Sequence, residues 1–127
     1  MTEPTKKVLV VEDEPAVALA LTDALKHEGF SVITAKDGES GLAMALAEHP
    51  DVTVTDIKMP VMTGLEMVDK LREDDWGKDA KVIILSNASD LETLQKAMER
   101  GMFHYMVKGD SSMADIVSAV KKHLGLQ

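Results

Sequence analysis

The strongest constraint on the fold is a regular alternation between short β-rich runs and longer segments with helical periodicity. The first run, "KVLVVE" over residues 7–12, is apolar up to its last residue, as a strand buried on both faces requires. After it, Val17, Leu21 and Leu25 recur at helical spacing up to Gly29. The same alternation predicts strands over residues 7–12, 30–35, 52–56, 81–86 and 103–108, with helices over 15–29, 38–48, 64–73, 89–100 and 112–125.

This order of elements predicts an α/β fold with a parallel sheet and helices on both of its faces. Two capping boxes, Ser89-x-x-Glu92 and Ser112-x-x-Asp115, indicate where the last two helices begin. No linker, repeat or low-complexity stretch interrupts the pattern. We therefore expect one domain over residues 1–127.

The composition is that of an ordinary globular domain, with 45% hydrophobic and 28% charged residues in a chain of 127. A domain of this size has a core large enough to fold without a metal or disulfide. The chain has no cysteine, which excludes disulfides, thiolate metal sites and cysteine nucleophiles. No apolar run approaches the roughly 20 residues of a membrane span, and the residues before the first strand contain no apolar stretch long enough for a signal peptide. We expect a cytoplasmic protein without membrane contact.

The net charge of −8 bears on the choice of partners. Nucleic-acid binding needs basic patches that neutralise phosphates, and the chain has no long run of Lys or Arg. We therefore expect no direct contact with nucleic acid. An acidic domain is better suited to a cation or to a basic protein surface.

Polar residues follow the predicted strands, at the edge where parallel sheets of this class bind ligands. Glu12 and Asp13 follow the first strand, Asp56 ends the third within "VTDIKMP", Ser86 ends the fourth, and Lys108 ends the fifth. Each has an ordinary alternative explanation: acidic residues favour a helix N-terminus, serine a turn, and lysine a solvated strand end. It is their convergence from four strands on one edge that indicates a site.

The chemistry of this set suits a divalent cation and a phosphoryl group. Two carboxylates about 4 Å apart repel by about 4 kcal/mol at a surface-like dielectric, and a cation removes that repulsion. Mg²⁺ binds through a few carboxylates and leaves room for phosphate oxygens. A carboxylate can also act as the nucleophile that forms an aspartyl phosphate. At Asp56 the new charge would be balanced by the metal, the Lys108 ammonium and the Ser86 hydroxyl.

These residues and their surroundings resemble the receiver domains of bacterial two-component response regulators, including the stand-alone chemotaxis type. The matching stretches are "VLVVEDEP" (8–15), "DVTVTDIKMPVMTGLEM" (51–67), "VIILSNAS" (82–89) and "YMVK" (105–108). They extend from the first predicted strand to the last. The resemblance implies a flavodoxin-like sheet of five strands in the order 2-1-3-4-5, an order known from the family rather than worked out from the pattern.

The resemblance also implies a role for each site residue. Asp56 would accept a phosphoryl group from a histidine kinase or a histidine phosphotransfer protein. Asp13, Asp56 and the backbone carbonyl of Lys58 would bind Mg²⁺, and Glu12 would hold it through water. Lys108 would pair with the phosphoryl oxygens.

Two further residues would transmit the phosphorylation event. Ser86 would move to donate to the phosphoryl group, and Tyr105 would then turn inward. The face formed by residues 89–100, 103–108 and 112–125 would change its preference for an output protein. A receiver of this kind is expected to be a monomer or a weak homodimer.

Some positions depart from the family pattern. Glu12 stands where Asp is frequent, Gly109 where a proline is usual, and Asn87 where a smaller residue is usual. Ala88, like Lys58, occupies a position that influences how water reaches the phosphoryl group. Because Ala88 has no polar side chain to orient water, we hypothesise slow hydrolysis of the phosphorylated form.

Three alternatives remain at this point. The chain is either a stand-alone regulator, which we favour, or a receiver excised from a longer regulator or hybrid kinase. A flavin- or nucleotide-binding module with a similar sheet would need a phosphate-binding loop after the first strand, where this chain has Glu-Asp-Glu-Pro. A magnesium phosphohydrolase commonly carries a second aspartate two residues after its nucleophile, where this chain has Lys58.

Overall fold

A computed structural model describes residues 5–86, 95, 104–108 and 112–126. Within these residues, five parallel strands form one sheet in the order β2-β1-β3-β4-β5, as expected. The elements are β1 (Lys7–Val11), α1 (Pro15–His27), β2 (Ser31–Ala35), α2 (Gly38–Glu48), β3 (Val52–Asp56), α3 (Gly64–Leu71), the 3₁₀ helix η1 (Gly77–Asp79), β4 (Val82–Ser86), β5 (His104–Val107) and α5 (Met113–His123).

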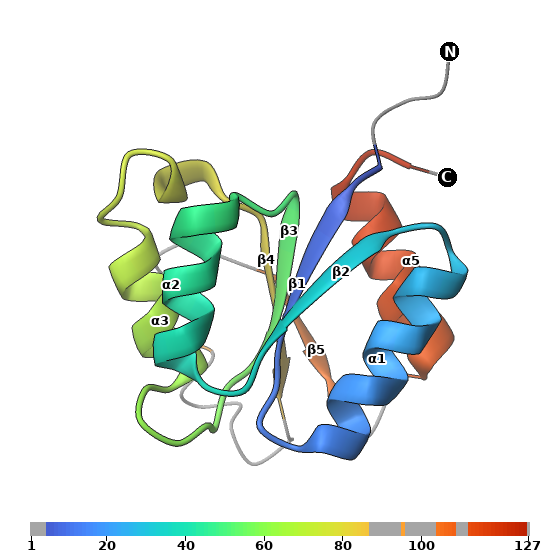
Figure 1. Ribbon diagram of the computed structural model, residues 1–127, viewed down its shortest axis with the longest axis horizontal. Helices are drawn as coiled ribbons and strands as arrows, with labels where there is room; N and C mark the ends of the chain where they lie inside the picture. The colour runs from blue at the N-terminus through green and yellow to red at the C-terminus, as the bar shows by residue number, and fades with distance from the viewer. Residues whose placement is uncertain (1–4, 87–94, 96–103, 109–111, 127) are drawn as a thin grey trace.

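The helices cover both faces of the sheet. Helices α1 and α5 lie on one side of the strands, and α2 and α3 lie on the other (Figure 1). The four described α-helices agree with four of the five predicted; the helix predicted over 89–100 lies outside the described residues, apart from the helical Gln95. Three predicted helices were too long: α1 ends at His27, α3 at Leu71 and α5 at His123.

The apolar strands divide the core into two layers. Because side chains alternate along a strand, Val8 and Val10 of β1 face the α1/α5 side, whereas Leu9 and Val11 face the α2/α3 side. All four side chains are at most 1% exposed. The prediction from the apolar run at residues 7–12 is confirmed: β1 is a central strand, and helices cover it on both faces.

Local sequence signals set several helix ends. Asp37 caps α2 by accepting from the Ser40 backbone N–H at 2.7 Å. Reciprocal capping boxes begin α3, at Thr63 with Glu66, and α5, at Ser112 with Asp115. The box predicted at residue 112 is confirmed.

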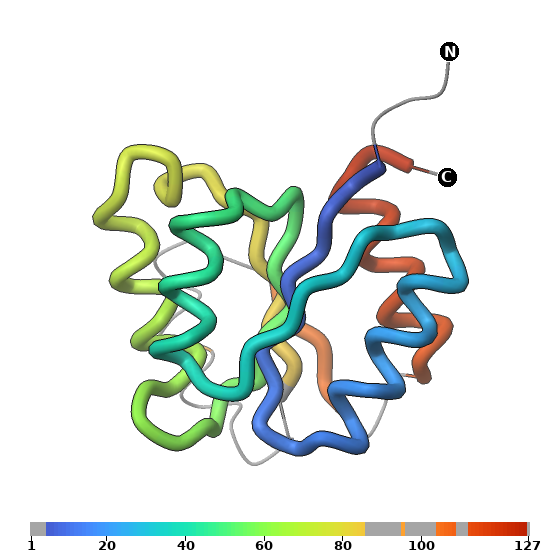
Figure 2. The backbone as a smooth tube through the Cα atoms, in the orientation of Figure 1, coloured from blue at the N-terminus to red at the C-terminus, as the bar shows by residue number. Residues whose placement is uncertain are grey.

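The turns after β1, β2 and β3 lie at the same end of the molecule (Figure 2). This is the carboxyl edge of the sheet, where the sequence predicted a site. Glu12 lies just beyond β1, yet its backbone N–H still donates to the carbonyl of Ala35 at 3.0 Å. The sheet therefore supports the backbone of the first acidic residue.

No described helix is long and apolar enough to cross a bilayer.

Candidate functional site

The aspartate that ends β3 is the centre of the site. Asp56 is only 8% exposed, because β3 is buried along its whole length between two other strands. Its Oδ1 accepts from the backbone N–H of Ile57 at 2.8 Å, and its Oδ2 accepts from Lys108 Nζ at 2.9 Å. The carboxylate is therefore oriented by one bond from its own turn and one from β5's end.

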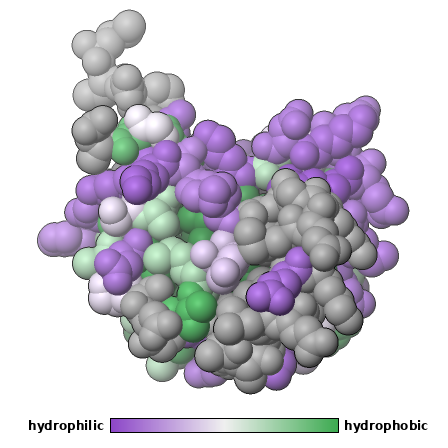
Figure 3. All heavy atoms as spheres, turned by 180° about the vertical axis from the view of Figure 1, so that it is seen from behind, coloured by the Kyte–Doolittle hydropathy of each residue, from purple (hydrophilic) through white to green (hydrophobic). Residues whose placement is uncertain are grey.

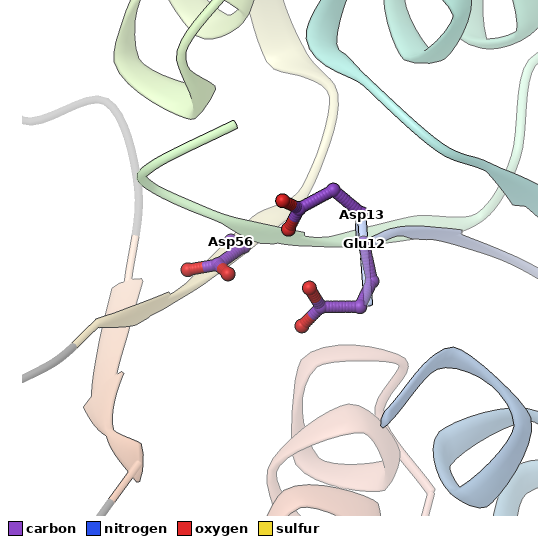
Figure 4. Close-up of side chains that lie close together, drawn as sticks. All are labelled: Glu12, Asp13 and Asp56. Atoms are coloured by element: carbon purple, nitrogen blue, oxygen red, sulfur yellow. The ribbon is translucent and has the colours of Figure 1, made fainter. Parts of the chain in front are cut away.

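Two further carboxylates come from the end of β1. Glu12 is 3% exposed, whereas Asp13 is exposed to solvent. Oxygen atoms of Glu12, Asp13 and Asp56 all lie within 4.8 Å of one another. Figure 4 shows the three side chains gathered around a common space. This arrangement of hard oxygen donors could hold a divalent cation.

Lys108 joins the two buried carboxylates. Besides its bond to Asp56, its Nζ donates to Glu12 Oε1 at 3.1 Å. Glu12 Oε2 accepts from the backbone N–H of Glu14 at 3.2 Å. The side chain of Lys108 is about a quarter exposed, so the ammonium lies between a buried pair of acids and solvent.

The electrostatics of the three groups are linked. Burial raises the pKa of Glu12 above its ordinary value, and the nearby charge of Asp56 adds to this, against the opposing hydrogen bonds from Glu14 N–H and Lys108. Burial disfavours the charged form of Lys108, but its bonds to Asp56 and Glu12 and their charges prevail, so the pKa of Lys108 is raised. Lys108 thus pairs with the two buried carboxylates, and Asp13 adds a third negative charge within 4.8 Å of them.

The remaining predicted residues are placed less completely. Ser86 ends β4 beside Val107 of β5, next to the Asp56–Leu85 pair; only its backbone is described. Tyr105 lies on β5 and is 38% exposed. Lys58 lies in the loop after β3 and is exposed. The proposed movements of Ser86 and Tyr105, and the metal contact of the Lys58 carbonyl, stay predictions, and Asn87, Ala88 and Gly109 lie outside the described residues.

One positioning residue was not foreseen. A Cβ added to Gly64 would lie 2.1 Å from the carbonyl oxygen of Asp56, so only glycine fits there. The Gly64 backbone N–H also donates to the Ile57 carbonyl at 2.8 Å. The start of α3 therefore packs directly against the backbone of the central aspartate. The glycine before "LEM" was visible in the sequence, but its close approach depends on how the loop folds back.

The loop between β3 and α3 contains a strained turn. Met62 N–H donates to the Pro60 carbonyl at 2.8 Å, and Val61 between them has φ 70°. This is a γ-turn with a β-branched residue at its centre, an uncommon and strained conformation. Val61 is 73% exposed, so its side chain gains nothing from burial to offset that strain.

Comparison with known proteins agrees with this geometry. Residues 8–121 match the model of the response regulator receiver domain. The chain is 38% identical over 115 residues to the transcriptional regulatory protein PrrA of Mycobacterium tuberculosis, covering 91% of this chain and 48% of PrrA. It is 29% identical to sporulation initiation phosphotransferase F of Bacillus subtilis, covering 96% of each.

Among solved structures, the chemotaxis response regulator CheY4 of Vibrio cholerae superposes with a TM-score of 0.86 at 29% identity, covering 95% of this chain and all of that one. The chain spans about half the length of the first curated relatives it matches, with 42% of one and 48% of another covered. The family match covers the strands, the acidic cluster and Lys108 together. The chain therefore belongs to the response regulator receiver domain family.

Proposed function

We propose that this receiver accepts a phosphoryl group on Asp56 in a reaction that depends on Mg²⁺. The observation that carries the proposal is the group formed by Asp56, Glu12, Asp13 and Lys108, with three carboxylates within 4.8 Å and the ammonium 2.9 Å from Asp56. A buried carboxylate beside a cation and a metal-binding group is suited to forming an acyl phosphate.

In the proposed step, a carboxylate oxygen of Asp56 attacks the phosphorus of the donor. The new O–P bond replaces the P–N bond of a phosphohistidine or the P–O bond of acetyl phosphate, and the donor group leaves. Lys108 already contacts this carboxylate, so its ammonium is in place to pair with a phosphoryl oxygen. The bond from Ile57 N–H to Oδ1 holds the carboxylate in one orientation. The receiver's own residues would thus catalyse the transfer.

The donor set fits magnesium. Asp13 and Asp56 would bind it directly with the Lys58 carbonyl, and Glu12 would hold it through water. When bound, the ion would neutralise the charge on the transferring phosphoryl group. Glu12 and Asp13 also line an open pocket of about 410 Å³ that extends to Lys36, so this side of the acidic group is open to solvent.

The test is incubation with Mg²⁺ and acetyl phosphate followed by intact mass measurement. We expect a gain of one phosphoryl group in the wild type and none in Asp56→Asn. Asp23→Asn is the matched control, because Asp23 is an exposed aspartate on α1 away from the site. A gain that persists in Asp56→Asn, or none in the wild type, would contradict the proposal.

Partners follow from the same function. The donor would be a histidine kinase or a histidine phosphotransfer protein, and the output protein would bind the face formed by residues 89–100, β5 and α5. Seen from behind, the surface carries apolar side chains bordered by hydrophilic ones, a composition that suits a protein partner (Figure 3).

We expect no direct nucleic-acid contact and a monomer or weak homodimer. Relatives named as transcriptional regulators support a cytoplasmic location.

The relatives include both a longer protein and one of similar length. The match covers only 48% of PrrA, but it covers 96% of the Bacillus protein. We retain the prediction of a single receiver domain over residues 1–127 that acts alone. An antibody raised against this domain tests it on an extract of the source cells. A band near 13.8 kDa is expected, and a much larger one would indicate a longer regulator or hybrid kinase.

A further inference from the structure

A pair of histidine rings joins the edge strand β5 to the end of α5, far from the carboxyl edge. His104 is the first residue of β5 and His123 is the last residue of α5. Their ring centroids lie 4.1 Å apart and the rings are nearly perpendicular, at 88°. Since β5 is an edge strand, this contact is one of the ties between the end of α5 and the outer side of the sheet.

The bonds of His123 determine which protonation state fits. Its Nδ1 lies 3.0 Å from the carbonyl oxygen of Ala119, which can only accept, so Nδ1 carries the proton. Nε2 is buried and has no hydrogen-bond partner among the described residues. A second proton on Nε2 would therefore be buried without an acceptor, which is costly for a charged group.

The groups around His123 add to this preference for the neutral ring. Lys81, just before β4, donates from Nζ to the His123 carbonyl at 2.6 Å and brings its charge close to the ring. His104 and Lys81 are the two described groups on other elements whose charges act on His123. On its own helix, Lys122 is adjacent, and Lys121 is paired with Glu28, the residue that follows α1. Burial lowers the pKa of His123, and Lys81 and His104 reinforce this against the bond to Ala119.

The ring contact is one of several contacts that hold the last turn of α5. Leu124 and Leu126, which follow the helix, pack against the core layer on the α1/α5 side. The chain there is closed by local bonds, with the N–H of Leu126 donating to the Lys121 carbonyl at 2.8 Å. A positive charge on His123 would be repelled by Lys81, and separation of the His123 and His104 rings would loosen this turn from β5.

We propose that the contact between His104 and His123 is a pH-sensitive latch, closed while the His123 ring is neutral and opened when acid protonates it, that controls how firmly the last turn of α5 is held against β5. The latch does not depend on phosphorylation. Its consequence for signalling rests on the proposed function, because β5 and α5 belong to the proposed output face: an acid-loosened α5 would alter that face whether or not Asp56 is phosphorylated.

Hydrogen–deuterium exchange of unphosphorylated protein tests the latch at about pH 7.5 and about pH 5.5, on either side of the ordinary histidine pKa of 6.5. After correction for the intrinsic effect of pH on exchange, we expect residues 119–126 to exchange several-fold faster at the lower pH. Helix α3, which has no histidine in its residues or its caps, serves as the internal reference. Equal corrected exchange at both values would overturn the proposal.

Matched variants identify the groups responsible. His104→Gln removes an exposed ring, so it is expected to fold, and it should remove most of the acid response. His27→Gln, on the exposed end of α1, should leave the response intact. A response that survives His104→Gln, or disappears in His27→Gln, would contradict the assignment. The titration of the His123 ring by NMR gives a second readout: in His104→Gln its pKa should rise, and an unchanged value would also count against the latch.

No phosphodonor or metal is used in these measurements. Failure of the latch would therefore leave the phosphoacceptor proposal intact, and failure of the acetyl phosphate test would leave the latch intact.

Discussion

The two edges of one sheet are built in opposite ways. At the carboxyl edge, Glu12, Asp13 and Asp56 lie close together, and Lys108 pairs with Glu12 and Asp56. At the amino edge, contacts join distant parts of the chain: the backbone N–H of Lys7 donates to Asp51 at 2.7 Å, and the rings of His104 and His123 contact each other.

The difference teaches what each edge is for. The contacts at the amino edge join separate elements, so that edge helps to hold the fold together. Like charges at the carboxyl edge repel, and a bound cation would reduce that repulsion.

The largest expected effect comes from the glycine that packs on Asp56. Gly64→Ala would place a methyl group against a backbone carbonyl, so we expect a loss of about 3 kcal/mol in unfolding free energy. Gly29, at the amino edge, has open space around it but φ 94°, so Gly29→Ala should cost only about 1 kcal/mol. Urea denaturation of both variants measures the comparison. Equal losses would show that Gly64 is not sterically required.

Magnesium should stabilise the carboxyl edge alone. At about ten times the dissociation constant, the ion should add about 1.4 kcal/mol to the free energy of unfolding. Asp13→Asn should abolish that response and, without metal, should be more stable than the wild type, because one of three repelling charges is gone. Thermal unfolding with magnesium and with a chelator gives both values, with Asp23→Asn as the control. An Asp13→Asn protein that still responds fully would refute the assigned ligand.

Relief of the strained γ-turn should have a smaller effect. Asparagine tolerates a positive φ better than valine, so Val61→Asn should stabilise the protein by about 1 kcal/mol or less, a rise of roughly 3 °C in melting temperature. Phosphorylation by acetyl phosphate should be retained, because no group that bears on Asp56 is removed. A lower melting temperature would mean that the valine side chain makes a favourable contact.

The smallest expected effect is on how the free energy of unfolding changes with pH. Glu12 at the carboxyl edge and His123 at the amino edge should change it in opposite directions. The pKa of Glu12 is raised by burial, so its contribution is fully present below the unfolded value of 4.5 and is lost as pH rises through the folded pKa. The pKa of His123 is lowered by burial, so its contribution is present above 6.5 and is lost as pH falls through the folded pKa. Stability is to be measured against pH without magnesium.

The pH dependence of stability that Glu12 contributes should be absent from Glu12→Gln, and the one that His123 contributes should be absent from His123→Gln. Relative to the wild type, Glu12→Gln should gain stability as pH rises, and His123→Gln should gain stability as pH falls. Slopes of the same sign in the two variants would contradict the contrast between the edges.

Much of the fold could be predicted because it depends on local patterns. The apolar run of β1 identified a central strand, and the capping box at Ser112 located the start of α5. Helix ends were less predictable: α3 ends at Leu71 rather than residue 73, because polar residues of the following loop continue its periodicity. Receiver-family motifs also led to the correct strand order, which alternation alone could not supply.

The sequence by itself determined the chemistry at the carboxyl edge. Asp56, Glu12, Asp13 and Lys108 each lie at or just after the end of a strand, and parallel strands bring their carboxyl ends to one side. That inference needs only the order of elements, so it required no coordinates.

Only the tertiary structure decided which atoms meet. Lys108 bonds both Glu12 and Asp56, and His104 meets His123 across two elements. Gly64 packs on a carbonyl eight positions before it in the chain. These contacts depend on how strands twist and helices pack, and no local pattern of residues encodes that packing. The phosphoacceptor chemistry could thus be inferred from order along the chain, whereas the latch at the other edge could be found only in space.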